Sequence, residues 1–213
     1  MGTPNPPYCM TQLSNKGNEY KFANPSLDMR RHDCNVVQTA MGIRAWSNDT
    51  IRPTSVQLRD IGADHSGGTG TLLSVRCFEH YGMVLGQDFF RFYRQDFSVV
   101  RQMNADGLYV VLFIDNGVLN GIDGGIYSGA LAFSGAHAIG TSGRWRSSGK
   151  RQWWIYDSCY DGRWSKLVNG GQGGRYPLGR TPAPVYAHRN AAAAYAQSPE
   201  GVYLASGYAI KYR

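Results

Sequence analysis

The sequence predicts a single α+β domain, with helices in the first half of the chain and strands in the second. Its 213 residues, 42% of them hydrophobic, can bury one large core. Apolar residues recur at helical spacing over much of residues 34–107, whereas later in the chain they form short runs typical of buried strands. Helices followed by strands indicate an α+β arrangement, because a parallel sheet would require the two to alternate.

The first helix of the core is predicted over residues 34–46, after an extended arm at residues 1–30 that is rich in Pro, Asn and other polar residues. Asp33 is the predicted N-cap, with a carboxylate that accepts from the free backbone N–H groups of the first turn. The apolar residues of this helix recur at helical spacing, so one face should be buried. They are Val36, Val37, Ala40, Met41, Ile43 and Trp46.

Two short helices are predicted further along the chain. The first covers residues 54–61 and is capped by Thr54 or Ser55. The second covers residues 98–107 and ends at Gly107.

A glycine-rich loop at residues 67–71 precedes another predicted helix. Such a loop can cradle phosphate, but this one lacks the Gly-Lys-Ser/Thr ending, so it is interpreted as a loop with Thr69 or Thr71 as N-cap. Gly82 closes this helix, and Cys77 inside it is predicted to serve packing.

Strands are predicted where apolar runs are bounded by turn residues. The runs lie at residues 108–114, 132–140, 152–159 and 202–212, and an Ala-rich stretch at residues 189–197 predicts a short helix. A basic, Gly- and Ser-rich connection between the second and third runs favours an antiparallel hairpin. The predicted organisation is an arm at residues 1–30, a core at 31–160 and a basic Gly-rich extension at 161–213 packed on the same domain.

The net charge of +7 is concentrated on one segment, because residues 144–180 hold eight Lys or Arg against two Asp. Such a patch suits an anionic partner, although it is equally consistent with a solvated basic face. Nucleic acid ranks below other anionic partners, since no DNA- or RNA-binding signature accompanies the patch.

The N-terminal residues do not form a secretory signal, and no apolar run is long enough to cross a membrane. We therefore expect synthesis in the cytoplasm, without a membrane partner, and either association with a virion or release at lysis.

The four cysteines contain no CxxC pair, which argues against a structural zinc site and a disulfide framework. No metal or cofactor is predicted. The cysteines are Cys9, Cys34, Cys77 and Cys159.

Three residues form a candidate catalytic set: Cys34 at the start of a helix, His137 in an apolar strand and Asp157 at the end of the next strand. A thiol at a helix N-terminus feels the positive end of the helix dipole, which favours the thiolate. Acyl transfer through a thiolate requires an imidazole that takes and returns a proton and a carboxylate that orients it. The alternative for Cys34 is a small buried hydrophobe, and for His137 a core histidine bonded to backbone.

The order and spacing of these motifs resemble the papain-like cysteine peptidases, over roughly residues 28–160. The similar group is the compact bacterial one that includes bacteriocin-processing (double-glycine) peptidases and related domains of phage lysins and tail proteins. The resemblance implies a papain-like fold, with N-terminal helices packed on an antiparallel sheet. It also implies that Cys34 is the nucleophile, His137 the general base and acid, and Asp157 the orienting group. The motifs are Asp33-Cys34, Gly68-Thr69-Gly70-Thr71, Gly135-Ala136-His137-Ala138-Ile139-Gly140 and Tyr156-Asp157-Ser158.

Two positions depart from that family's pattern. Asn35 stands where the family has Gly, and its bulk is expected to narrow the cleft. Asp28 stands where the family has a glutamine that helps to hold the oxyanion, and a carboxylate there would repel the developing charge. The candidate replacements for that glutamine are Gln12, Asn18 and Asn24.

The predicted function is therefore that of a cysteine peptidase acting through a Cys34 thioester, phage-encoded or virion-associated and directed at cell-wall peptides. The alternative is a weakly active or inactive papain-like domain with a structural or binding role in a phage tail or virion assembly. The Tyr-rich final strand favours the alternative, because an exposed aromatic strand invites a partner. A third possibility is transglutaminase-type acyl transfer, which uses the same residues and differs only in the acceptor.

Overall fold

The structure of the chain is a computed structural model that describes residues 10, 24–30, 32–115, 136–147, 150–156, 158, 181–184 and 204–212. Within these residues the chain forms the helices α1 (Leu27–Arg30), α2 (Cys34–Trp46), α3 (Ser55–Gly62), α4 (Thr71–His80) and α5 (Phe97–Ala105). It also forms the strands β1 (Phe89–Asp96), β2 (Tyr109–Asp115), β3 (Ala136–Ser147), β4 (Lys150–Tyr156), β5 (Thr181–Pro184) and β6 (Leu204–Ile210). The fold is α+β, as predicted. None of the helices described is long and apolar enough to cross a membrane.

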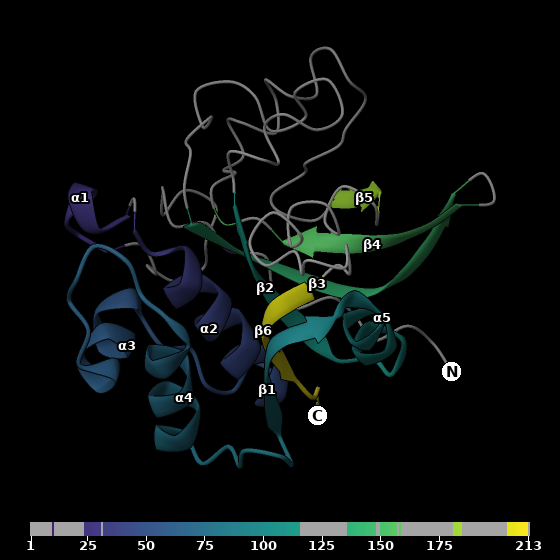
Figure 1. Cartoon of the computed structure of the whole chain (residues 1–213). Helices are drawn as coiled ribbons and strands as arrows, with labels where there is room; N and C mark the ends of the chain where they lie inside the picture. Colours follow the sequence, from purple (N-terminus) through teal and green to yellow (C-terminus); the bar gives the residue numbers. More distant parts are fainter. Residues whose placement is uncertain are drawn as a thin grey trace.

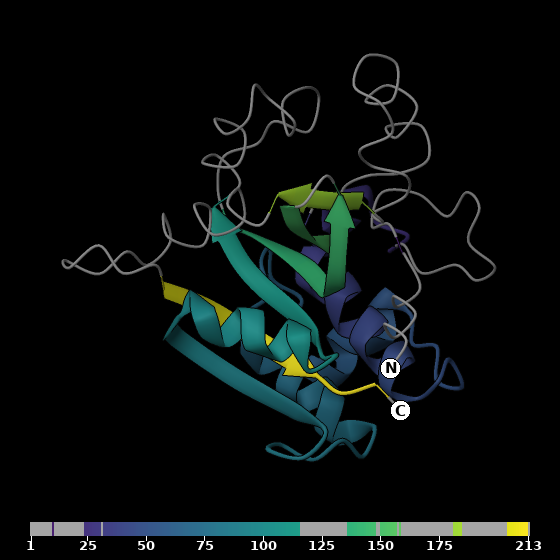
Figure 2. The same ribbon diagram turned by 90° about the vertical axis from the view of Figure 1, so that its right-hand side faces the viewer.

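The strands form one antiparallel sheet in the order β1-β6-β2-β3-β4-β5. Helices α2, α3 and α4 lie on one face of this sheet and α5 on the other (Figures 1 and 2). Side chains alternate accordingly. Tyr208 reaches Thr39 of α2, whereas Thr141 bonds Asn104 of α5. Because β6 comes from the end of the chain yet lies between β1 and β2, the C-terminal strand is an interior part of the sheet.

The interior position of β6 corrects the expectation of an exposed aromatic strand. Tyr208 is 1% exposed, and its hydroxyl donates to Asn35 at 3.0 Å. Tyr203 lies outside the described residues, and Tyr212 is partly buried. The Tyr208 side chain therefore packs in the core and is not available to a partner.

Helix α2 is buried on all sides and not on one face as predicted. Every residue from Asn35 to Trp46 is buried, since α3, α4 and the sheet enclose the helix. The polar members of this set, Gln38 and Thr39 among them, bond to residues of neighbouring elements. The apolar periodicity of the sequence predicted the helix correctly, but it did not predict that α2 lies in the centre of the fold.

The predicted capping hydrogen bond from the Asp33 carboxylate to α2 is also wrong. Asp33 occupies the N-cap position but makes no side-chain bond to the helix. Its carboxylate accepts instead from the Ser55 hydroxyl at 2.6 Å and from the Arg59 Nε at 2.7 Å. Arg59 is fully buried, and a buried guanidinium requires a counter-charge more than a helix end requires a cap.

The ends of the other helices agree with the sequence in part. Thr54 caps α3 through a reciprocal capping box with Gln57, as predicted. The N-cap of α4 is Gly70, so the expectation of Thr69 or Thr71 is wrong.

Glycines end two of the helices as expected. Gly82 follows α4 with a φ of 83°, and Gly107 follows α5 with a φ of 85°. Both lie in the left-handed region that side-chain-bearing residues rarely adopt.

Three of the predicted strands correspond to β2, β3 and β4, and the last to β6. The sequence did not predict β1 or β5. The predicted helix at residues 189–197 and most of the arm at residues 1–30 lie outside the described residues.

Candidate active site

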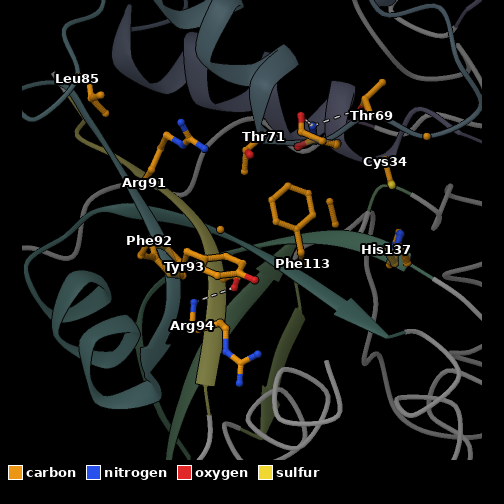
Figure 3. A pocket seen from close by; sticks show the side chains of 17 residues that line it. Cys34, Thr69, Thr71, Leu85, Arg91, Phe92, Tyr93, Arg94, Phe113 and His137 are labelled. Carbon is orange, nitrogen blue, oxygen red and sulfur yellow. Dashed lines mark hydrogen bonds between the residues drawn. The ribbon is translucent and has the colours of Figure 1, made fainter. Parts of the chain in front are cut away.

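Cys34 is the first residue of α2, at the end of that helix that faces β3. Its side chain is partly buried. In Figure 3 the sulfur points toward His137, which lies in β3. Sequence positions 103 residues apart are thus brought together, as the motif spacing predicted.

His137 is 2% exposed and hydrogen-bonds the Cys34 sulfur. Burial by itself raises the pKa of Cys34. The hydrogen bond to His137, the positive charge of that ring and the backbone N–H groups of Ala138 and Asn35 outweigh it and lower the pKa of Cys34 overall. A lowered pKa favours the thiolate, which is the nucleophilic form of cysteine.

Gln38, one turn beyond Cys34, ties α2 to the strand that carries His137. Its Nε2 donates to the Ala138 carbonyl at 3.5 Å, and its Oε1 accepts from the Tyr109 hydroxyl. The Tyr109 ring reaches this point because Gly140 in β3 leaves the room that a side chain would fill. These contacts fix the spacing of helix and strand beside the Cys34–His137 pair.

Arg59 holds the chain that enters α2. Besides pairing with Asp33, its guanidinium donates to the backbone carbonyls of Asp64 and Ser66 at 3.0 Å each and of His32 at 3.4 Å. The turn before Cys34 is therefore anchored by a buried ion pair whose donors are satisfied.

Asn35 braces α2 against the start of α4. Its amide nitrogen donates to Gly70 at 3.0 Å, Ser74 at 3.1 Å and Thr69 at 3.3 Å, and its oxygen accepts from Tyr208. The side chain is 1% exposed. Asn35 thus serves an internal hydrogen-bond network, whereas its bulk was expected from the sequence to narrow the cleft.

A cavity of about 970 Å³ opens beside Cys34 and His137 (Figure 3). It lies between the start of α4 and the strands β1, β6, β2 and β3. Its lining consists of Cys34, Asn35, Gly68, Thr69, Gly70, Thr71, Leu85, Arg91, Phe92, Tyr93, Arg94, Phe113, Ala136, His137, Ala138, Ser206 and Gly207. The Cys34–His137 pair therefore has room for a substrate beside it. Apolar and cationic side chains line the opposite wall of the cavity.

The other candidates from the sequence are Asp157, Gln12, Asn18 and Asn24. Asp157, Gln12 and Asn18 lie outside the described residues, as do the side chains of Asp28 and of the basic segment at 144–180. Asn24 is described, but it does not line the cavity, and its amide donates to Ser55 at 3.5 Å.

Cys77 packs inside α4 as predicted, and the other described histidines lie away from the cavity. His32, His65 and His80 are exposed. Cys77 is fully buried in α4 and donates to the Leu58 carbonyl at 3.3 Å.

Several residues of the site were missed from sequence, namely Gln38, Arg59, Tyr109, Arg91 and Phe113. A sequence signal existed for Gln38, since a polar residue among the apolar positions of a helix points to a buried hydrogen bond.

Within the described residues there is no cluster of three or more metal-binding side chains. The chain matches no protein-family model, and no curated protein matches it at the sequence level.

Proposed function

We propose that this protein is a cysteine peptidase of papain-like type that cleaves peptide bonds through a thioester at Cys34. The observation that carries the proposal is the hydrogen bond between Cys34, at a helix N-terminus, and His137, beside a cavity of substrate size. The α+β architecture, with its first helices on one face of an antiparallel sheet, is compatible with this family.

In the proposed reaction the Cys34 thiolate attacks the substrate carbonyl, and His137 delivers its proton to the leaving amine. Water that His137 deprotonates then attacks the thioester carbonyl, the C–S bond breaks, and release of the carboxylic acid product restores the Cys34–His137 pair. The backbone N–H of Cys34 has no acceptor within α2, because it belongs to the first turn, and it donates to the oxyanion. Asp157 keeps its proposed role of orienting His137.

The test compares the wild type with Cys34→Ala on a mixture of defined peptides, with products identified by mass spectrometry. Cys77→Ala is the matched control, because it removes a thiol that does not line the cavity. We expect cleavage by the wild type and by Cys77→Ala but not by Cys34→Ala. Cleavage that survives in Cys34→Ala, or absence of cleavage in all three proteins, contradicts the proposal.

The proposed substrates are peptides of the bacterial cell wall, cut by a phage-encoded or virion-associated enzyme. The support is the basic composition of residues 144–180, which suits an anionic wall. Release of peptides from purified wall fragments by the wild type and not by Cys34→Ala is the expected result. Incorporation of an added amine in place of hydrolysis would instead identify transglutaminase-type transfer.

A further inference from the structure

Apart from His137, the basic residues in the described lining of the cavity are two arginines. Arg91 and Arg94 come from β1, and the described lining contains no aspartate or glutamate. Both side chains are exposed to the cavity and solvent. The wall opposite the Cys34–His137 pair is therefore cationic.

These two arginines differ from the other arginines whose side chains the structure describes. The guanidinium groups of Arg44, Arg52 and Arg59 pair with carboxylates, while those of Arg30 and Arg76 donate to backbone carbonyls. No ion pair or hydrogen bond of the described residues engages the guanidinium of Arg91 or Arg94. Two unpaired guanidinium groups at one cavity are suited to an anionic ligand.

Arg91 is the better placed of the two. In Figure 3 its side chain extends across the cavity toward Thr71, whereas that of Arg94 extends away from Phe113. The backbone explains the difference. The register of β1 with β6 shifts between Phe92 and Gln95, and Arg94 has a φ of 48° and donates its backbone N–H to Ser206 at 3.0 Å. This bulge turns Arg94 out of the alternation that directs Arg91.

The register of the sheet gives the scale of the cavity. Arg91 pairs with Tyr208, Tyr208 with Val111, and Val111 with Gly140. Three interstrand steps of about 4.8 Å make about 14 Å, and His137 lies three residues further along β3, which adds about 10 Å in the strand direction. The backbones of Arg91 and His137 are therefore about 17 Å apart, the length of about five residues of extended peptide.

Apolar side chains occupy the space between the two ends. The Phe113 ring lies between Arg91 and Cys34 in Figure 3, and Leu85 and Phe92 also line the cavity. A ligand that spans the cavity meets the Cys34–His137 pair at one end, an apolar surface in the middle and the guanidinium of Arg91 at the other end.

We propose that Arg91 is a specificity-determining residue that binds a carboxylate of the substrate, two to five residues from the bond that Cys34 attacks. The substrate class is an acidic peptide with an apolar side chain between its carboxylate and the scissile bond. This inference rests on the proposed function, because it takes Cys34 as the point of attack.

The test measures how fast Cys34 is alkylated by short peptide electrophiles, with the modified residue identified by mass spectrometry. One series carries a chloromethyl ketone at the C-terminus and the other a haloacetyl group at the N-terminus, so that both sides of the scissile bond are sampled. Each probe holds a single Glu two to five residues from the electrophile, and its matched probe holds Gln there. We expect Glu to react about 3- to 10-fold faster than Gln at one or more of these positions in the wild type.

Two variants locate the effect. Arg91→Gln should bring the Glu/Gln ratio to about 1, whereas Arg94→Gln, which makes the same change of charge, should leave the preference in place. Ratios near 1 at every position of the wild type overturn the inference. So does a preference that survives in Arg91→Gln, or that falls equally in both variants.

Failure of the inference is distinguishable from failure of the proposed function. Neutral iodoacetamide reports the reactivity of Cys34 without a peptide and also checks that each variant retains an intact site. Rapid alkylation of Cys34 with no preference for Glu removes the inference alone. Slow alkylation of Cys34 by iodoacetamide and by every peptide probe removes both.

Discussion

The start of α2 and the middle of α4 each carry a cysteine, and the two have opposite chemistry. Burial raises the pKa of both thiols. At Cys77 nothing opposes burial, and the pKa rises to about 12. At Cys34 the hydrogen bond and charge of His137, with the N–H groups of Ala138 and Asn35, reverse the effect and lower the pKa.

The comparison shows that contacts, and not burial or residue type, decide whether a cysteine in this fold can act as a nucleophile. Cys77 has only a carbonyl acceptor, that of Leu58, which favours the protonated thiol. Cys34 has donors and a cation, which favour the thiolate. Removing the donors of Cys34 should therefore give this thiol the chemistry of Cys77.

Replacement of His137 by Ala should have the largest effect, because it makes the surroundings of Cys34 resemble those of Cys77. We expect peptide hydrolysis to fall by about 10³-fold or more, since the proton acceptor and the charge that stabilises the thiolate are both lost. The measurement is the cleavage rate of a peptide that the wild type cuts. His80→Ala is the control, because that ring is exposed at the end of α4, and it should leave the rate unchanged. Equal rates in wild type and His137→Ala would break the comparison.

Replacement of Arg59 by Met should destabilise the fold most among the predicted stability changes. It leaves the carboxylate of Asp33 buried without its counter-charge, so the free energy of unfolding should fall by about 3–5 kcal/mol in urea denaturation. Arg52→Met is the matched control. Arg52 also pairs with an aspartate, but its side chain is 42% exposed, and we expect a loss of about 1 kcal/mol or less. Adding Asp33→Asn to Arg59→Met should recover part of the loss. A single variant as stable as the wild type would show that the turn before Cys34 does not depend on this pair.

Replacement of Asn35 by Ala tests the network that joins α2 to the start of α4. The Tyr208 hydroxyl loses the oxygen to which it donates, so we expect a loss of about 1–3 kcal/mol in the free energy of unfolding. Tyr208→Phe in the Asn35→Ala background should add little, because the two residues share one interaction. Fully additive losses would contradict this coupling.

Replacement of Cys77 by Ala should have the smallest effect of the four. The sulfur is buried in the core, and its loss should lower the free energy of unfolding by about 1–2 kcal/mol. Hydrolysis at saturating substrate should not change, since Cys77 does not line the cavity. A loss of hydrolysis in a folded Cys77→Ala protein would mean that the comparison assigns the wrong cysteine.

Local chemistry allowed much of the fold to be predicted from sequence. Helix α3 with its Thr54 cap, the glycines that end α4 and α5, and the apolar strands β2 and β3 follow from residues close together in the chain. The meeting of Cys34 and His137 was predicted from motif order, and the structure brings the two into contact. Whether they act in catalysis stays a prediction.

The rest depended on contacts between residues far apart. Asp33 looks like a helix cap until Arg59, 26 residues later, is placed beside it. Strand β1 was missed because its aromatic and charged residues do not alternate regularly, and its last four residues are exposed. The interior position of β6 and the cationic side of the cavity likewise arise only when the last strand pairs with β1 and β2 from the middle of the chain.

The most direct test of the account is the pH dependence of iodoacetamide alkylation at Cys34 and Cys77 in one folded sample, resolved by mass spectrometry. Because the pKa of Cys34 is lowered, its rate should rise and level off at a lower pH than that of the same residue in the unfolded chain. Cys77, with a pKa of about 12, holds a thiolate fraction of about 10⁻⁵ at pH 7 and should stay unmodified. In His137→Ala the midpoint for Cys34 should move upward, because burial is then less strongly opposed. A Cys34 profile that matches the unfolded chain, or that His137→Ala does not shift, would contradict the central claim that His137 activates this thiol.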